Sequence, residues 1–174
     1  MAKLKALIDV FLQPGDYFVA DAAYQIRTML GSCVSITLWH PATRIGAMSH
    51  FLLPERRRAE GDAPALDGRY GDEALMLMLA ELARAGICPA QCQGKIFGGG
   101  NMFVSHLHSG AEHVGRKNGR AARALLLKHG VPVVSESLFG LGHRQIIFDV
   151  SNGDVWSHQV GLPAPQSQAE GNSL

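Results

Sequence analysis

Residues 26–53 read IRTMLGSCVSITLWHPATRIGAMSHFLL, and this stretch decides the fold. Two apolar runs rich in β-branched residues flank a break that contains Pro41, a pattern typical of a β-hairpin. A turn centred between Pro41 and Ala42 places Cys33 opposite His50. Directly opposed side chains share a face, with Cβ atoms about 4.5–5.5 Å apart. The hairpin therefore predicts a thiol and an imidazole within reach of each other.

The two faces of this hairpin differ in character, because successive side chains of a strand point to opposite sides. One face is apolar and can pack a core; it carries Val34, Ile36, Leu38, Ile45, Ala47 and Phe51. The other is smaller and more polar; it carries Cys33, Ser35, Thr37, Gly46, Met48 and His50. A turn of another length would change the pairing.

The length of 174 residues and the hydrophobic content of 47% suit one domain, which we expect to span residues 1–161. Residues 162–174 are rich in Pro, Gln, Ser and Gly and are predicted to form a disordered tail. A net charge of +1 gives no reason to expect a nucleic-acid partner. Three cysteines, with neither a signal peptide nor an apolar run of about 18 residues, favour the reducing cytoplasm and no membrane insertion.

Hydrophobic periodicity and turn residues outline the other elements. The predicted elements are short strands at 17–20, 94–97 and 132–138, helices from Tyr70 to before Gly86 and over about 114–129, and strands at 144–150 and 154–159 around Asn152-Gly153. Residues 55–69 are charged and without periodicity, which indicates an exposed, mobile loop. The order shows no regular βαβ alternation, so we expect an α+β fold: β-sandwich-like sheets flanked by two main helices.

Cys33 is a candidate nucleophile, because Gly31-Ser32 before it forms a flexible turn whose backbone N–H groups, near Ser32 and Cys33, can point at an oxyanion. His50 would then lower the pKa of the thiol and protonate a leaving group. The alternative is a small buried cysteine beside a hydrogen-bonded core histidine. Residues chemically able to orient the imidazole are Thr28, Ser32, Asn101 and Asp21, and spacing does not choose among them.

The glycines of Lys95–Asn101 resemble a phosphate loop, but a P-loop places its lysine after the glycines, so a tight turn is expected instead of a nucleotide site. The basic runs 56–58 and 116–123 lack the interleaved aromatic residues of a nucleic-acid site, so we expect them to lie on solvated surfaces. A docking patch for an acidic protein partner is the alternative. Possible zinc ligands are Cys88, Cys92, His106, His108 and His113. Their spacing is not that of a usual zinc site, so no metal is expected.

Seven stretches together resemble the chemoreceptor glutamine deamidase family, CheD, of bacterial chemotaxis. They are Pro14–Val19, Leu30–Val34, Gly46–Pro54, Arg69–Gly71, Lys95–Phe103, Val114–Asn118 and Ile147–Asp149. The Leu-Gly-Ser-Cys block followed by the Met-x-His-x-x-Leu-Pro block is the most specific part of the resemblance.

The resemblance implies a cysteine deamidase that converts glutamine side chains of methyl-accepting chemotaxis receptors to glutamate, with Cys33 as nucleophile and His50 as base. It implies a fold similar to the catalytic domain of cytotoxic necrotizing factor toxins, no cofactor, and a CheC-type phosphatase as a possible partner. The family has a threonine six residues before its cysteine, where this chain has Arg27. Thr28 is the nearest substitute, but alternation along a continuous strand would turn it away from Cys33 unless Gly31-Ser32 bulges.

Two other functions use the same residues. The first is a non-catalytic chemotaxis adaptor that binds receptors or a CheC-type phosphatase, with deamidation lost because of Arg27. The second is a cysteine peptidase, although papain-like chains place their histidine much farther downstream than His50 lies from Cys33.

Overall fold

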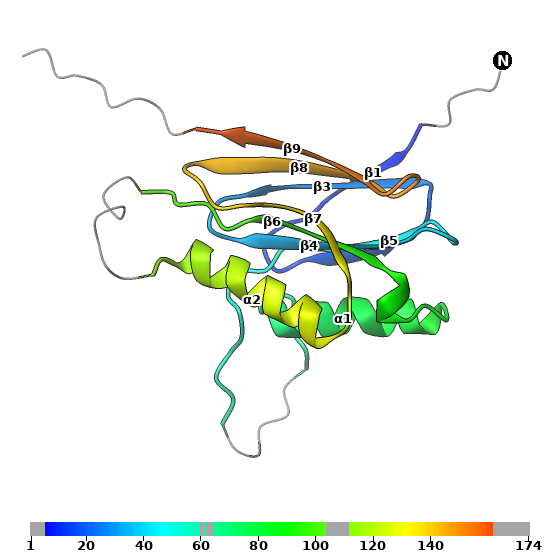
Figure 1. The fold of residues 1–174 in the computed structure, drawn as a ribbon, viewed down its shortest axis with the longest axis horizontal. Helices are drawn as coiled ribbons and strands as arrows, with labels where there is room; N and C mark the ends of the chain where they lie inside the picture. Colours follow the sequence, from blue (N-terminus) through cyan, green and yellow to red (C-terminus); the bar gives the residue numbers. More distant parts are fainter. Residues whose placement is uncertain (1–5, 60, 62–64, 104–111, 162–174) are drawn as a thin grey trace, which may run out of the picture.

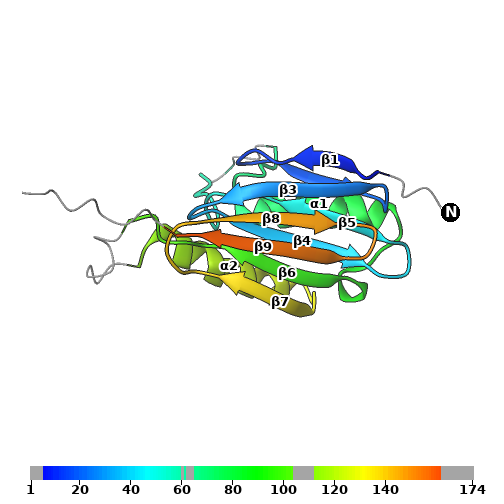
Figure 2. The same cartoon turned by 90° about the horizontal axis from the view of Figure 1, so that it is seen from above.

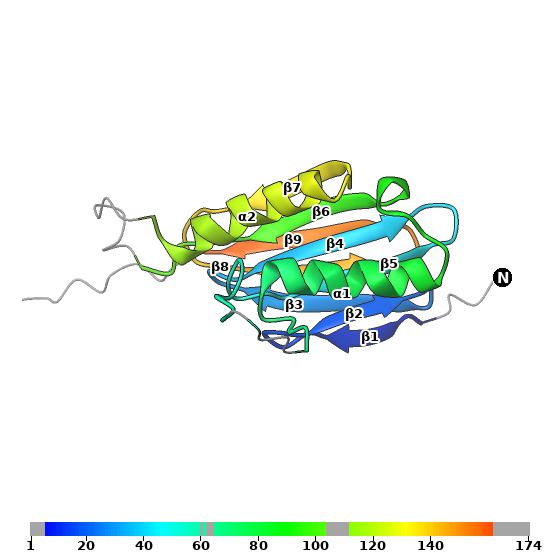
Figure 3. The same ribbon diagram turned by 90° about the horizontal axis from the view of Figure 1, so that it is seen from below.

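The computed structural model describes residues 6–59, 61, 65–103 and 112–161. Along these residues the elements are β1 (Ile8–Phe11), β2 (Tyr17–Ala20), β3 (Tyr24–Leu30), β4 (Val34–His40), β5 (Ile45–Ser49), α1 (Gly71–Arg84), the short 3-10 helix η1 (Pro89–Gln91), β6 (Gln93–Gly98), α2 (Val114–Lys128), β7 (Val133–Leu138), β8 (His143–Asp149) and β9 (Asp154–Val160). The strands form two sheets, ordered β1-β3-β8-β9 and β2-β5-β4-β6-β7. The sheets stack face to face, and α1 and α2 cover the outer face of the five-stranded sheet (Figures 1 and 3).

This architecture confirms the predicted α+β class with two sheets and two main helices. The proposed likeness to the cytotoxic necrotizing factor catalytic domain and the extent of the domain, residues 1–161, stay predictions. The tail at 162–174 lies outside the described residues.

The central hairpin forms, but its predicted register is wrong. β4 ends at His40, which pairs with Ile45, so the turn takes in all four residues between them and is centred one residue later than expected. Arg44 closes this turn with a φ of 53°. The shift moves every partner by two residues, so Cys33 is a diagonal neighbour of His50 rather than its direct partner.

The predicted faces survive this correction, because a shift of two residues keeps each side chain on its side of the sheet. Val34, Ile36 and Leu38 are buried in a core between the five-stranded sheet and the helices. Met48, on the other face, is buried in a second core between the sheets, together with Ile26. The polar face of the hairpin therefore points into the sandwich, where Cys33 and His50 meet the second sheet.

Both helices form where hydrophobic periodicity predicts them, and each buries apolar residues on the sheet. α1 buries Leu75, Met78 and Leu82, and Gly86 follows its end with a φ of 74°. α2 buries Ala122 and Leu126, whereas Ala121 is half-buried.

The remaining strands also agree with the sequence. β6, β7 and the β8–β9 hairpin lie within a residue or two of their predicted positions. The N-terminal residues, for which the sequence predicted no element, form β1, which pairs in parallel with β3.

The described ends of the loop between residues 54 and 70 are anchored, unlike the freely mobile loop predicted. Glu73 is 1% exposed and accepts hydrogen bonds from Arg56 Nε, Arg58 Nη2 and the Asp67 backbone, at 2.7–2.8 Å. Burial alone would raise the pKa of Glu73, but these donors outweigh it, so the pKa lies below its usual value. The buried Glu73 carboxylate thus binds residues from both ends of the loop.

We predict that Glu73→Gln lowers the free energy of unfolding by about 1–3 kcal/mol, because a neutral amide replaces a buried carboxylate with charged donors. Trypsin should then cleave faster at Arg56 and Arg58. Glu81→Gln is the matched control, since Glu81 makes only an exposed pair with Arg84 in the same helix. Equal proteolysis of the two variants would show that Glu73 does not anchor the loop.

Candidate active site

The candidate residues gather at one end of the sandwich, where the chain crosses from one sheet to the other. β3 ends at Leu30 in the four-stranded sheet, and β4 begins at Val34 in the five-stranded sheet. Cys33 lies in this crossing, and His50 directly follows β5. Figure 2 shows these ends of β3 and β4 on the same side of the molecule as the start of α2.

Thr28 and His50 are in direct contact, although alternation along a continuous strand would turn Thr28 away from Cys33. Thr28 Oγ1 lies 2.8 Å from His50 Nδ1, and the two residues are 1% and 3% exposed. The condition of a continuous strand is not met, because β3 and β4 belong to different sheets. Thr28 points inward from the opposite sheet, so alternation along β3 turns it toward the hairpin rather than away from it.

Arg27 takes no part in this contact. It points to the outer side of the four-stranded sheet, where its Nε donates to Asp9 Oδ2 at 2.7 Å and its guanidinium lies 5.3 Å from the Phe11 ring centroid. The hydrogen bond from Arg27 is the main reason that the pKa of Asp9 lies below its usual value. The threonine that contacts His50 is therefore Thr28, one position later in the chain than Arg27.

The hydrogen bonds of Thr28 define which nitrogen of His50 carries the proton. Thr28 Oγ1 donates its single hydrogen to the Leu12 carbonyl at 2.7 Å. The same oxygen can then only accept from the imidazole, so Nδ1 carries a hydrogen and the lone pair of a neutral ring lies on Nε2.

Burial keeps this imidazole neutral. Desolvation lowers the pKa of His50 from 6.5 to about 4, although the Leu12 carbonyl and the Asp16 carboxylate oppose the change. A shift of this size favours the neutral ring by about 3 kcal/mol. Near neutral pH, His50 is therefore a base with an available Nε2 lone pair.

Cys33 is half-buried, and burial raises the pKa of its thiol, while its own backbone N–H acts in the opposite direction. Burial thus favours the neutral form of the Cys33 thiol, as it favours the neutral form of the His50 imidazole. Among the residues described, the backbone N–H groups of Ser32 and Cys33 donate to no other residue. Backbone donors that bind no other residue, next to a thiol, can bind a developing oxyanion.

The glycine-rich segment after β6 forms the predicted tight turn, and this turn supports the backbone of Cys33. Gly98 has a φ of 110°, and a Cβ there would lie 2.3 Å from the Cys33 carbonyl oxygen. The Gly99 N–H donates to that carbonyl at 2.9 Å, and the Gly100 N–H donates to the Gly31 carbonyl at 2.9 Å. Only a chain without side chains can approach the cysteine turn so closely.

Asn118 of α2 joins the site, and sequence reasoning gave it no role. Its Nδ2 donates to the Ser32 carbonyl at 3.0 Å and to the Leu52 carbonyl at 2.7 Å. The available signal was a polar residue four positions before the buried Ala122, on the stripe that faces the sheet.

Asp21 and Asn101, which are chemically able to orient the imidazole, form hydrogen bonds elsewhere. Asp21 accepts from the Ala23 N–H, and Asn101 accepts from the Phe103 N–H. Among the described residues, the side-chain hydrogen bond to the His50 ring comes from Thr28. Of the set that spacing left open, Thr28 is thus the residue with a described hydrogen bond to the ring.

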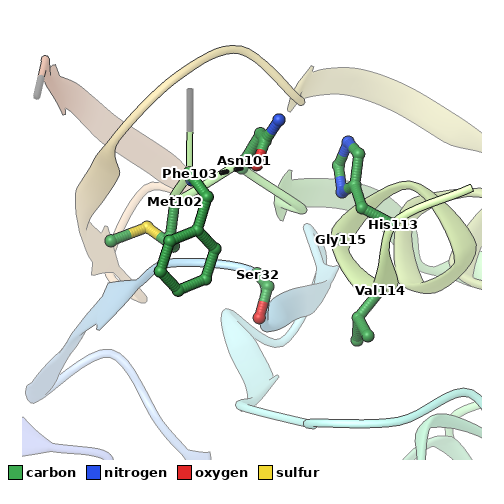
Figure 4. Close-up of a pocket in the computed structure, with 8 residues that line it drawn as sticks. Ser32, Asn101, Met102, Phe103, His113, Val114 and Gly115 are labelled. Carbon is green, nitrogen blue, oxygen red and sulfur yellow. Dashed lines mark hydrogen bonds between the residues drawn. The ribbon is translucent and has the colours of Figure 1, made fainter. Parts of the chain in front are cut away.

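A cavity of about 140 Å³ opens beside Ser32. Figure 4 shows Met102 and Phe103 on one side of it, and His113 and Val114 at the start of α2 on the other. Its lining is mainly apolar, so it suits an apolar side chain that enters next to Ser32.

A metal site gains no support from the described residues. Cys88 is exposed and Cys92 is buried, while His106 and His108 lie outside the described part of the chain. No three His, Cys, Asp or Glu side chains within that part are arranged to hold a metal ion. Neither of the described helices is long and apolar enough to cross a membrane.

Comparison with known proteins agrees with the resemblance in the sequence. Residues 52–159 match the model of the CheD family, described as CheD chemotactic sensory transduction. The chain is 74% identical, over the full length of both chains, to "Probable chemoreceptor glutamine deamidase CheD 2" of Albidiferax ferrireducens. It is 41% identical to a CheD 1 protein of the same description from Chromobacterium violaceum, over 86% of this chain and 77% of that one.

A third relative, "Probable chemoreceptor glutamine deamidase CheD" of Pseudomonas savastanoi, is 40% identical over 93% of this chain and 90% of its own. Among solved structures, a Bacillus licheniformis hypothetical protein, YfiH, has a TM-score of 0.42 and 14% identity, over 70% of this chain and 50% of that one. That likeness is too distant to carry an argument. The family model and the full-length relatives show that this chain belongs to the CheD family.

Proposed function

We propose that the chain is a protein-glutamine deamidase that hydrolyses glutamine side chains of methyl-accepting chemotaxis receptors to glutamate. Cys33 is the nucleophile, His50 the base, and Thr28 the residue that orients the imidazole. The hydrogen bond between Thr28 and His50 carries the proposal, because it leaves the His50 Nε2 lone pair free to take a proton. The names of the relatives support glutamine of chemoreceptors as the substrate.

Acylation begins when the Cys33 sulfur attacks the carbon of the glutamine carboxamide. His50 Nε2 takes the thiol proton as the carbon–sulfur bond forms, so no free thiolate is needed beforehand. The carbonyl oxygen becomes negative and is stabilised by the backbone N–H groups of Ser32 and Cys33. His50 then gives the proton to the departing nitrogen, and ammonia leaves a γ-glutamyl thioester on Cys33.

Deacylation uses the same groups with water in place of the thiol. His50 Nε2 removes a proton from a water molecule, whose oxygen attacks the thioester carbon. The carbon–sulfur bond breaks, Cys33 recovers a proton, and glutamate is released. The sum is glutamine plus water to glutamate plus ammonia, so neither a metal nor an organic cofactor is required.

The sequence also permits an adaptor without catalysis, for which the main support is Arg27 in place of the family's threonine. That support is weakened, because Thr28 supplies the hydroxyl contact to His50. A CheC-type phosphatase as partner and a cytoplasmic location remain proposals from the resemblance. The cytoplasm fits a substrate on the cytoplasmic part of a receptor.

We predict that Cys33→Ala abolishes glutamine-to-glutamate conversion in a receptor cytoplasmic fragment, with a loss of at least about 1,000-fold, because the covalent route is removed. Mass spectrometry of the fragment and ammonia release measure this. Cys88→Ala removes an exposed cysteine outside the site and should leave the rate unchanged. Full activity of Cys33→Ala would refute the mechanism, whereas wild type that binds the fragment without converting it would favour the adaptor.

Thr28→Val should lower kcat about 10- to 100-fold, since it keeps the shape of the side chain but removes the acceptor for His50 Nδ1. Thr28→Ser keeps the hydroxyl and should retain most of the activity. Steady-state kinetics on the receptor fragment, with the melting temperature measured for each variant, makes the comparison. If the two variants were equally active, Thr28 would have no part in orienting the imidazole.

The lowered pKa of His50 also predicts the pH dependence. A histidine whose pKa lies near 4 accepts a proton only as the pH falls through that value, so kcat/KM should hold from pH 7 down to about 5. Alkylation of Cys33 by iodoacetamide should be slow at pH 6 and rise at alkaline pH, because its thiol is neutral. An acid limb near pH 6.5, or fast alkylation at pH 6, would indicate a charged imidazole instead.

A further inference from the structure

The ladder between β4 and β5 opens next to the proposed catalytic residues. Val34 and Phe51 exchange both backbone hydrogen bonds, at 3.1 and 3.0 Å. An antiparallel ladder would continue with a bond from the Leu53 N–H to the Ser32 carbonyl. Instead, the Leu53 N–H donates to the Arg69 carbonyl, so the two strands separate beyond this pair.

Asn118 fills the gap between the separated strands. Its single Nδ2 donates to Ser32, the residue before the nucleophile, and to Leu52, two residues after the base. The Ser32 carbonyl therefore receives from α2 the hydrogen bond that the ladder no longer supplies, and the same side chain links it to the Leu52 carbonyl.

The start of α2 is shaped so that Asn118 reaches this gap. A Cβ at Gly115 would lie 2.6 Å from the carbonyl oxygens of Gly99 and Gly100, and one at Gly119 would lie 2.6 Å from the Phe139 ring. The helix thus packs directly against the glycine turn that supports Cys33. This close approach brings Asn118, which lies between the two glycines in the helix, against the segments that contain Ser32 and Leu52.

The amide oxygen of Asn118 indicates that this residue does not serve stability alone. Asn118 is fully buried, and its Oδ1 has no hydrogen-bond partner among the described residues. A buried acceptor without a partner lowers the stability of the fold. Asn118 thus makes two hydrogen bonds through Nδ2 at the expense of a buried Oδ1 that destabilises the fold.

We propose that Asn118 is a positioning residue of the deamidation reaction. Its carboxamide sets the separation of the segment that carries Cys33 and the segment that carries His50, so that thiol and imidazole meet in the reactive geometry. The inference rests on the proposed function, since it assigns Asn118 a role in the same reaction. Small displacements of reacting groups reduce rates strongly, so loss of the bridge acts on kcat.

The test compares Asn118→Leu and Asn118→Ser with wild type, using ammonia release from a receptor cytoplasmic fragment at a temperature where circular dichroism shows each protein folded. Asn118→Leu fills the same space without a donor and should lower kcat about 10- to 100-fold, with KM changed by less than about threefold. Asn118→Ser has one hydroxyl donor and should fall between Leu and wild type. It also provides the answer if Asn118→Leu does not fold.

Leu126→Ala is the matched control, because it removes buried packing from the same helix without touching either carbonyl. It should lower the melting temperature at least as much as the Asn118 variants, yet leave kcat within about twofold of wild type. Equal kcat values for the Asn118 variants and wild type would overturn this inference alone. A wild-type protein without ammonia release would overturn the proposed function, and this inference with it.

Discussion

The hydroxyl of Thr28 is the point on which the arrangement depends, because it is shared between the Leu12 carbonyl and the imidazole of His50. Its one hydrogen goes to Leu12, so its oxygen accepts the Nδ1 hydrogen of His50 and directs the Nε2 lone pair away from the four-stranded sheet. The contact also joins the two sheets, since Thr28 belongs to one and His50 follows a strand of the other. A neutral, oriented base is therefore a consequence of how the sheets stack.

The cysteine side of the site is held by backbone contacts rather than by charge. The turn at Gly98–Gly100 meets the crossing at Gly31–Cys33 through two hydrogen bonds, and Asn118 ties that crossing to Leu52, two residues after His50. Segments far apart in the sequence thus converge at one end of the sandwich. The cavity beside Ser32, the residue before Cys33, opens at the same end.

The sequence predicted the fold class, both helices and both faces of the central hairpin, because these depend on local periodicity and on side-chain alternation. The predicted register of the hairpin was wrong, because the length of the turn after His40 depends on a positive φ at Arg44, which cannot be read from the residue type. The sequence also left the direction of Thr28 open, because a change of sheet at Gly31 cannot be told from a continuous strand. The place of Asn118 in the site was not predicted for a related reason. Its contacts join Ser32 to Leu52, and only the packed fold brings those carbonyls together.

Nitrogen-15 NMR of the His50 ring at pH 7 measures which ring nitrogen carries a hydrogen. We expect a neutral imidazole with hydrogen on Nδ1 and an unprotonated Nε2, since Thr28 Oγ1 can only accept from the ring and burial lowers the pKa of the ring to about 4. A hydrogen on Nε2 alone, or on both nitrogens at this pH, would contradict this expectation.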